Sequence, residues 1–175
     1  TLVYFTGVSW GLSERTFVMV LPARGEMAWV SPKFEEDRAL ELIKPGSDIR
    51  TWEEDQSPYN VIVKALADRG LHAGRIGIEE RLRFFIFDGL RKAAPGLEFV
   101  SADPVTVGCR SVKSPAEIAL MQRANDITVE AYKAALAMLK EGMSKGDFSA
   151  NAAAAFRALG FTGGIGASFG EQSSF

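Results

Sequence analysis

The longest regular pattern of hydrophobic positions lies between Ser114 and Gly142. Apolar residues recur there every three or four positions, which is the spacing of one face of an α-helix: Leu120, Ala124, Ile127, Ala131, Ala134 and Met138. Ser114 and Glu117 have the spacing of a capping box, and Pro115 suits the first helical position. The pattern predicts a helix of about seven turns, ended by Gly142, that divides the chain.

Before this helix, short strands alternate with amphipathic helices. The segments 15–21 and 27–30 are rich in β-branched and aromatic residues and flank a Pro-Ala-Arg-Gly turn, which predicts a hairpin. Further elements are expected as helix 34–43, a strand around 49, helix 58–70, strand 75–79, helix 81–94 and strand 97–100. The residues expected to face inward in the first of these helices are Phe34, Ala39, Leu40 and Ile43. This order predicts an α/β fold with a mixed, mostly parallel sheet and flanking helices.

After the long helix, the pattern predicts a loop at 141–146, a helix over 147–159 and a strand that begins near 165. The glycines at 163, 164 and 166 suggest a phosphate-binding loop only at first sight. Nucleotide-binding loops run from a strand into a helix, whereas this cluster follows a helix and enters a strand. A turn that another backbone approaches closely is the favoured interpretation.

Composition excludes more functions than it indicates. The chain has 175 residues, 47% of them hydrophobic, which is enough for one domain and part of another. A net charge of −2 without basic clusters gives no reason to expect nucleic acid or a membrane surface as a partner. No apolar run reaches the roughly 18 residues that span a bilayer. The single cysteine and the missing signal-peptide pattern predict a cytoplasmic protein, and the missing initiating Met indicates a piece of a longer one.

Most candidate catalytic groups have a simpler structural interpretation. Cys109 has no His near it in sequence to activate it, so we expect a small interior hydrophobic residue. His72 is the only histidine and is expected on an exposed loop. The acidic residues between 35 and 41 are expected to form a solvated helix face. The glutamates at 79 and 80 are neighbours on a strand and point to opposite faces.

Trp10 is the most suggestive single residue. It lies on a loop at the expected edge of the sheet, shortly after the Thr-Gly pair at 6–7. Aromatic residues at such positions often line a pocket or contact a partner. Packing in the core is a slightly favoured alternative for this side chain.

Several segments, in order and at suitable separations, resemble motifs of the creatinase/prolidase/aminopeptidase P family of metallopeptidases. Residues 4–7 (Tyr-Phe-Thr-Gly) are similar to the family's Tyr-Leu/Phe-Thr-Gly, and residues 110–118 to its junction Arg-x-x-Lys-Ser-x-x-Glu-Ile. Residues 141–144 resemble a Pro-Gly-Met-Thr loop with Glu141 in place of Pro. Residues 165–175 resemble the first catalytic strand, Val-x-Ser-Gly-x-Asn, with Gln172 in place of Asn.

The resemblance implies two domains. Residues 1–108 would form the creatinase/prolidase-type amino-terminal domain, which is ribonuclease H-like. Residues 109–175 would begin a pita-bread catalytic domain with helices at 115–141 and 147–159. Family members commonly dimerise through the amino-terminal domain, so a homodimer is expected.

The resemblance also implies a reaction. Two divalent metal ions (Mn, Co or Zn), held by two Asp, one His and two Glu, activate a water molecule that attacks the peptide bond before proline. All of these ligands would lie beyond Phe175, so no catalytic or metal-binding residue is assigned, and the chain alone is expected to be inactive. Trp10, Ser168 and Phe169 are the residues expected near a proline-containing dipeptide or short peptide.

Three functional hypotheses follow. The first is the amino-terminal part of a cytoplasmic Xaa-Pro dipeptidase, with aminopeptidase or creatinase activity as less favoured variants. The second is a non-catalytic relative whose pita-bread domain binds a peptide or a protein partner. The third treats residues 1–108 as a dimerisation unit that folds by itself.

Overall fold

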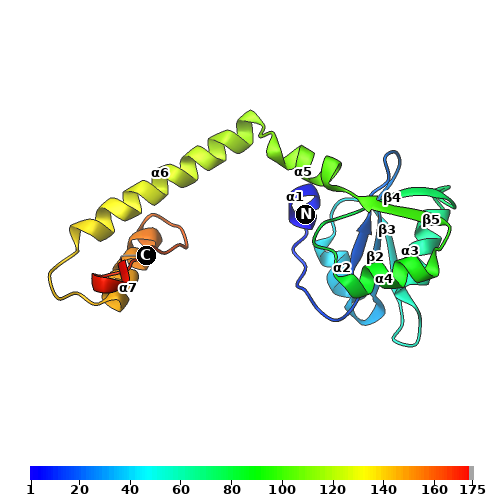
Figure 1. The fold of residues 1–175 in the computed structure, drawn as a ribbon, viewed down its shortest axis with the longest axis horizontal. Coiled ribbons are helices and arrows are strands. Elements are labelled where there is room, and N and C mark those ends of the chain that lie inside the picture. The colour runs from blue at the N-terminus through cyan, green and yellow to red at the C-terminus, as the bar shows by residue number, and fades with distance from the viewer. Residues whose placement is uncertain (174–175) are drawn as a thin grey trace. The chain divides into compact units, whose positions relative to one another are not determined.

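The computed structural model describes residues 1–173, apart from the side chains of residues 171 and 172. By contacts within the chain, it divides into two compact units, Thr1–Ser111 and Val112–Phe175 (Figure 1). The expected domain boundary between residues 108 and 109 stays a prediction.

The strands of the first unit combine antiparallel and parallel pairing. β1 (Val18–Val20) pairs with β2 (Ala28–Pro32) in the antiparallel sense, as the predicted hairpin requires. β2 pairs in parallel with β3 (Asp48–Trp52), and β4 (Gly74–Ile78) pairs in parallel with β5 (Leu97–Ser101). The mixed, mostly parallel α/β class is therefore confirmed.

The strands form two hydrogen-bonded sheets rather than one continuous sheet. One sheet has the order β1-β2-β3, and the other consists of β4 and β5. Both sheets nevertheless contribute to one hydrophobic cluster, because Val18 and Val20 of β1 pack against the same buried residues as Ile76 of β4 and Phe99 of β5. The two sheets are therefore joined by the packing of their side chains and not by backbone hydrogen bonds.

Three of the helices of the first unit lie within the ranges 34–43, 58–70 and 81–94 that the sequence predicts. Their bounds are α1 Leu2–Thr6, the 3₁₀ turn η1 Lys33–Glu35, α2 Glu36–Leu42, α3 Pro58–Ala67, α4 Phe84–Ala93 and α5 Asp103–Ser111. Pro58 takes the first position of α3 after Ser57, where its missing N–H costs no hydrogen bond. Gly7 ends α1 with a φ of 74°, a left-handed conformation that glycine adopts without strain.

One prediction about these helices is wrong, and the sequence predicts neither α1 nor α5. Phe34 and Leu40 were expected to face inward, yet they are 64% and 58% exposed, since the segment opens as a 3₁₀ turn and only Ala39 and Ile43 reach the core. The helix α5 was not predicted at all. Thr106 is its only buried residue, so the helix lies mostly at the surface of the unit.

β2 is the central strand of its sheet, and both of its faces are covered. Its residues are buried along its whole length. Because successive side chains point to opposite faces, Val30 joins a cluster under α3 and α4, whereas Trp29 joins a cluster with Ala39 and Ile43 around α2. The two helices α3 and α4 lie side by side over the first of these faces (Figure 1).

The second unit is built on two capped helices, α6 (Pro115–Ala137) and α7 (Lys145–Ala158). Ser114 Oγ accepts the Glu117 N–H at 3.2 Å, and Glu117 Oε2 accepts the Ser114 N–H at 2.8 Å, so the predicted capping box is confirmed. Ser144 and Asp147 form a second box at the start of α7. The helix α6 ends before Gly142, because Met138 and the next residue already bond to carbonyls three residues back.

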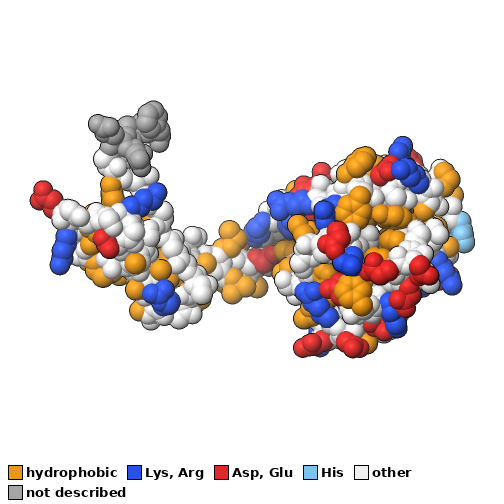
Figure 2. Space-filling model, turned by 90° about the horizontal axis from the view of Figure 1, so that it is seen from below, with side chains coloured by type: hydrophobic (Ala, Val, Ile, Leu, Met, Phe, Trp, Pro, Cys, Tyr) orange, Lys and Arg blue, Asp and Glu red, His pale blue; other side chains and the backbone are white. Residues whose placement is uncertain are grey.

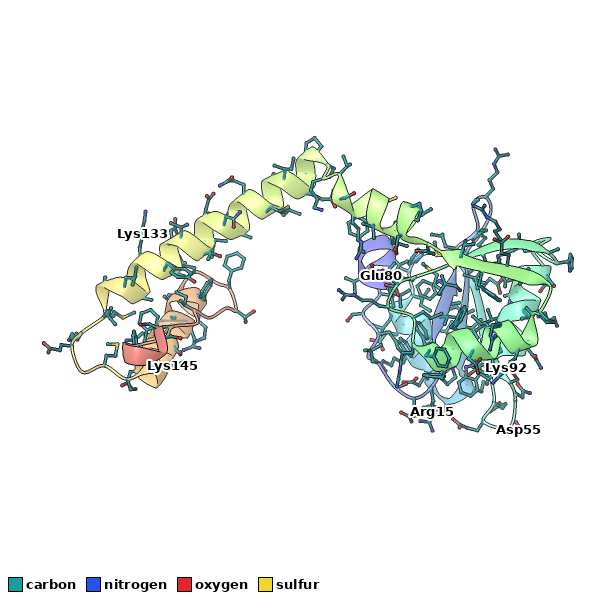
Figure 3. All side chains as sticks on the ribbon, viewed as in Figure 1. Arg15, Asp55, Glu80, Lys92, Lys133 and Lys145 are labelled. Carbon is teal, nitrogen blue, oxygen red and sulfur yellow. The ribbon has the colours of Figure 1, made fainter. Side chains whose placement is uncertain are left out.

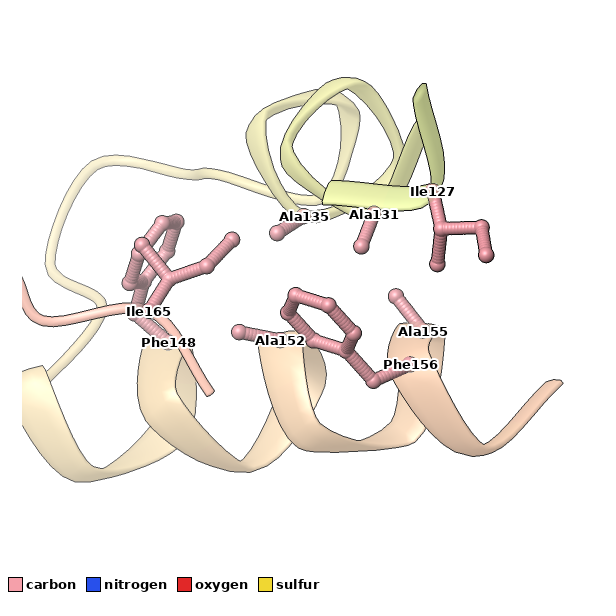
Figure 4. Packing of buried hydrophobic residues seen from close by; sticks show 8 residues of the cluster. All are labelled: Ile127, Ala131, Ala135, Phe148, Ala152, Ala155, Phe156 and Ile165. Carbon is pink, nitrogen blue, oxygen red and sulfur yellow. The ribbon is translucent and has the colours of Figure 1, made fainter. Parts of the chain in front are cut away.

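α6 and α7 pack through small residues (Figure 4). The buried cluster consists of Ile127, Ala131, Ala135, Phe148, Ala152, Ala155, Phe156 and Ile165. Alanines at the contact let the two helix backbones approach closely, as the run 152–155 predicts. The predicted inward stripe of α6 is only partly correct, since Ile127 and Ala131 are buried but Leu120 is 71% exposed. Leu120, Ala124, Ala134 and Met138 are exposed because α7 covers only one part of α6.

The strand expected at 165–175 does not form in the described residues. Residues 161–169 are irregular and are followed by the 3₁₀ turn η2 (Gly170–Ser173), while residues 174–175 lie outside the description. A strand needs a hydrogen-bonded neighbour, and the described part of this unit contains none. Gly163 lies close to a side chain of α7, because a Cβ at this position would stand 2.7 Å from the ring of Phe156. The close approach is thus made by a side chain and not by a backbone.

Candidate functional site

Trp10 lies at the edge of the core and keeps part of its indole exposed. Its ring is parallel to Phe17, with 3.8 Å between centroids and 2° between planes, and Phe17 in turn contacts Trp29. The guanidinium of Arg38 lies 4.3 Å from the centroid of the Trp10 ring. The side chain therefore combines the two alternatives of the sequence, because it packs on the core and remains accessible.

The loop that carries Trp10 is fixed at both ends. Val8 and Thr16 are buried, and Trp52 Nε1 donates a 3.0 Å hydrogen bond to the Thr16 carbonyl. Arg15 Nε donates to Glu54 Oε1 at 2.7 Å at the surface of the first unit (Figure 3). Arg83 donates to the carbonyl of Ser13. An irregular segment is thus held in one shape by contacts to Trp52 at the end of β3, to the loop after β3 and to Arg83, the residue before α4.

Leu12 stands at the tip of this loop. Its side chain is 90% exposed, although the residues on either side of the loop are anchored. Exposing a large apolar side chain on a fixed loop gains nothing for the stability of the unit itself. Leu12 and Trp10 together make the loop an apolar surface available for contact.

Ser168 and Phe169 belong to the second unit. Both are exposed, and Phe169 makes an edge-to-face contact with Phe148, with 5.9 Å between centroids. Phe169 thereby anchors the irregular segment to α7. Because Trp10 lies in the other unit, a common site of these three residues stays a prediction.

The predicted exposure is confirmed for His72 and wrong for Cys109. His72 is exposed in the bend between α3 and β4, as predicted. Cys109 was expected in the interior, and this is wrong, because its side chain is exposed on α5. The exposed surface of α5 explains the error, since Thr106 is the helix position that reaches the core.

Two of the acidic residues between 35 and 41 form ion pairs at the surface. Glu35 accepts from Arg38 at 3.0 Å and Glu36 from Lys33 at 2.5 Å, as expected of a solvated helix face. Figure 2 shows acidic and basic side chains interspersed over the visible face of the first unit. Among the described residues, no three of His, Cys, Asp and Glu lie close enough together to hold a metal ion. The described residues therefore offer no ligand set for the metals that the family resemblance implies.

A groove between β3 and α3 was not predicted from the sequence. It encloses about 680 Å³ and is lined by Arg50 and Thr51 of β3 and by polar side chains of α3, including Asn60 and Lys64. Arg50 does not present a free charge there. Its Nε and Nη2 each donate at 2.9 Å to Asp48, and its Nη1 donates at 2.5 Å to Asp68.

A smaller hollow of about 430 Å³ lies at the carboxyl ends of β4 and β5. Its walls combine phenylalanines of α4 and β5 with Glu79, Glu80 and Asp103. The first two carboxylates have partners: Glu79 accepts from the Thr1 hydroxyl at 2.5 Å, and Glu80 lies 3.6 Å from Arg110. Parallel strand ends gather polar groups at one edge, which the sequence predicts only if the pairing is known.

Asp48 forms ion pairs with Arg50 and Arg69 next to the groove between β3 and α3. Its substitution tests how much these ion pairs contribute to stability. Hydrogen bonds from Arg50, then from Arg69, lower the pKa of Asp48 below its ordinary value, against the opposing effect of burial. A carboxylate with a lowered folded-state pKa stabilises the fold above its unfolded-state pKa, and this contribution disappears as the pH falls through the folded-state value. We expect Asp48→Asn to cost about 1–3 kcal/mol at pH 7.

The pH dependence separates this charge effect from a packing effect. The difference in unfolding free energy between Asp48→Asn and the unsubstituted chain is expected to shrink as the pH falls below about 4, the ordinary pKa of an aspartate, because the unfolded chain then takes up the proton before the folded chain does. Urea unfolding at a series of pH values measures it. A difference that stays constant down to pH 2.5 would contradict the proposed role of the charge.

No helix within the described residues has the length and apolar character needed to cross a bilayer. This finding agrees with the hydropathy of the sequence, which lacks a long apolar run. It concerns the two units alone.

Comparison with known proteins gives a consistent set of matches. Residues 1–112 match the family model of the creatinase/prolidase N-terminal domain. An uncharacterized peptidase of Schizosaccharomyces pombe is 34% identical over 156 residues, which cover 81% of this chain and 33% of that protein. Ectoine hydrolase of Halomonas elongata is 26% identical over 138 residues, covering 73% of this chain and 35% of that protein. The chain spans about a third of the length of these curated relatives.

Solved structures share the fold. Dipeptidase PepE from Mycobacterium ulcerans superimposes with a TM-score of 0.76 and 25% identity, over 90% of this chain and 42% of that one. The prolidase from Thermococcus sibiricus gives a TM-score of 0.72 with 20% identity over the same shares. These matches cover both units in sequence, although each solved chain is more than twice as long.

Proposed function

Because the chain belongs to the creatinase/prolidase N-terminal domain family, we propose that it is the amino-terminal part of a metal-dependent Xaa-Pro peptidase. The complete protein would hydrolyse the bond before proline in a dipeptide or short peptide. The family match over residues 1–112 carries this proposal. The dipeptidase and prolidase structures that share the fold support it.

In this proposal, the described chain restricts the substrate and does not cleave it. The first unit would limit the length of the peptide and contribute to a homodimer, and Trp10, Ser168 and Phe169 would lie near the substrate. Two divalent ions, Mn, Co or Zn, would be bound by residues of the complete protein outside this chain. They would supply an activated water and polarise the scissile carbonyl. A cytoplasmic location is part of the same proposal.

Two alternative functions of the complete protein make predictions that differ from those of the Xaa-Pro peptidase. A non-catalytic relative would bind a peptide or protein partner without hydrolysing it. The match to an ectoine hydrolase favours a second enzymatic candidate, the hydrolysis of ectoine. Both alternatives concern the complete protein.

The test uses the complete protein with added Mn²⁺, Co²⁺ or Zn²⁺. Its substrates are Ala-Pro and Xaa-Pro-Yaa peptides, their matched Ala-Ala analogues, and ectoine. We expect hydrolysis of the Xaa-Pro bond at least about 100-fold faster than of the analogue, and loss of this activity by about the same factor after chelation. Adding back one of the metals should restore it.

Each other outcome is informative. Hydrolysis of ectoine without hydrolysis of Xaa-Pro would replace the proposed substrate. Peptide binding without any turnover would favour the non-catalytic relative. Activity of residues 1–175 alone would contradict the proposal that the catalytic groups lie elsewhere in the protein.

A further inference from the structure

The orientation of the Trp10 indole is set by two contacts from different elements. Phe17 lies parallel to the ring, and the Arg38 guanidinium of α2 lies over it, 4.3 Å from the centroid. Stacking on one side chain and coverage by a cation both depend on the position of the ring plane. Rotation of the side chain about χ1 would therefore break both contacts. The loop backbone is fixed at its ends, so the remaining freedom is that of the indole.

Arg38 is itself held in place. Its Nη1 donates to Glu35 Oε1 at 3.0 Å, and Glu35 is the better buried partner, with 20% of its side chain exposed against 49% for Arg38. Ala39, the next residue, is fully buried against the cluster around Trp29 and fixes α2 on the core. The cation is thus carried by a rigid helix and oriented by a carboxylate before it reaches the indole.

This arrangement goes beyond what stability of the unit requires. Arg38 is half exposed, and an exposed ion pair with Glu35 stabilises a fold only slightly. With Phe17 parallel to the ring and the guanidinium over it, the partly buried indole keeps only its edge uncovered, and that edge is held in a single orientation. A ring that is already oriented loses less conformational freedom when a ligand binds to it.

We propose that Arg38 is a positioning residue, which presets the orientation in which the Trp10 indole contacts the apolar ring of the substrate's proline. This inference rests on the proposed function, because it takes Trp10 to lie near the substrate. Arg38 does not touch the peptide. It acts through Trp10, and Glu35 acts through Arg38.

The first measurement does not depend on activity. The complete protein is labelled with 5-fluorotryptophan, and the Trp10 resonance is assigned by its loss in Trp10→Phe. In Arg38→Ala, this resonance is expected to shift and broaden, because the indole samples more than one orientation. The resonances of Trp29 and Trp52, which are buried, should stay unchanged.

The second measurement is the kinetics of Xaa-Pro cleavage. Arg38→Ala is expected to raise KM about 3- to 10-fold and to leave kcat within about twofold, since the variant alters the binding surface and not the reacting groups. Arg38→Lys retains a cation and should recover part of the loss. Lys44→Ala, which removes the same charge from an exposed position just beyond α2, serves as the matched control and should change neither quantity.

The outcomes separate the inference from the proposed function. An unchanged Trp10 resonance in Arg38→Ala would overturn the inference whatever the activity. A shifted resonance with an unchanged KM would also overturn it, because the orientation would then not matter for the substrate. An unsubstituted protein that cleaves no Xaa-Pro bond would instead refute the proposed function, which the spectra of Arg38→Ala cannot do.

Discussion

Replacement of Trp29 by alanine is expected to lower the free energy of unfolding of the first unit by about 3–5 kcal/mol. The side chain is fully buried on the central strand β2, and it packs against Val8, Ala39 and Ile43. Its Nε1 also donates a 3.1 Å hydrogen bond to the Pro45 carbonyl. Alanine would leave a cavity under α2 and would remove the donor of that carbonyl.

Urea unfolding followed by tryptophan fluorescence measures this loss. Every tryptophan of the 175-residue chain lies at position 10, 29 or 52, so the signal reports on the first unit, and Trp10 and Trp52 remain as probes in the variant. Leu12→Ala is the control, since a 90% exposed residue should change stability by less than about 0.5 kcal/mol. A loss below about 1 kcal/mol for Trp29→Ala would mean that the core around β2 is not packed as described.

Gly89→Ala is expected to destabilise the first unit by about 1–3 kcal/mol, although alanine is the better helix former. Gly89 lies in α4, where α3 crosses it. A Cβ at this position would stand 2.2 Å from Cζ of Tyr59, whose ring packs directly on the glycine. The ring must move aside to admit the methyl group, and the contact between α3 and α4 loosens with it.

Gly108→Ala provides a matched control of opposite sign. Gly108 lies in α5 with a right-handed backbone, and a Cβ there would meet no atom within 4 Å. The same substitution should therefore stabilise the unit by about 0.5–1 kcal/mol, through the lower entropy of the unfolded chain and the better helix propensity. A double-mutant cycle with Tyr59→Ala completes the test: without the ring, Gly89→Ala should cost nothing. Equal effects at both glycines would contradict the described packing of α3 on α4.

These predictions concern the unit that would restrict the substrate in the proposed peptidase. The Trp29 cluster supports α2, which carries Arg38, and the loop before β1, which carries Trp10. Loss of this cluster should therefore disturb the orientation of Trp10 as well as the stability of the unit. The same buried cluster therefore supports both the core of the first unit and the orientation of Trp10.

Several features of this protein follow from the sequence alone because their causes are local. The capping box of α6 depends on Ser114 and Glu117, three residues apart, and both hydrogen bonds form as predicted. The hairpin of β1 and β2 follows from two apolar segments around a tight turn. The resemblance of short motifs to the creatinase/prolidase family is confirmed by the match over residues 1–112.

Other predictions failed where the outcome depends on residues far apart. Cys109 is exposed because α5 turns only Thr106 to the core, and which face of this helix is covered depends on the elements packed against it. The expected strand at 165–175 lacks a neighbour to pair with in the described residues of its unit. Phe34 is exposed because a 3₁₀ turn shifts its direction relative to a regular helix.

The sequence by itself determined the order of most strands and helices, the capped start of α6 and the family, because each of these depends on spacings within a few residues. Only the tertiary structure decided which side chains meet. The contact of Arg38 with Trp10 and the bridging of Asp48 and Asp68 by Arg50 join separate elements. Such contacts depend on how strands pair and helices pack, and that geometry is fixed by the whole unit and not by any single segment.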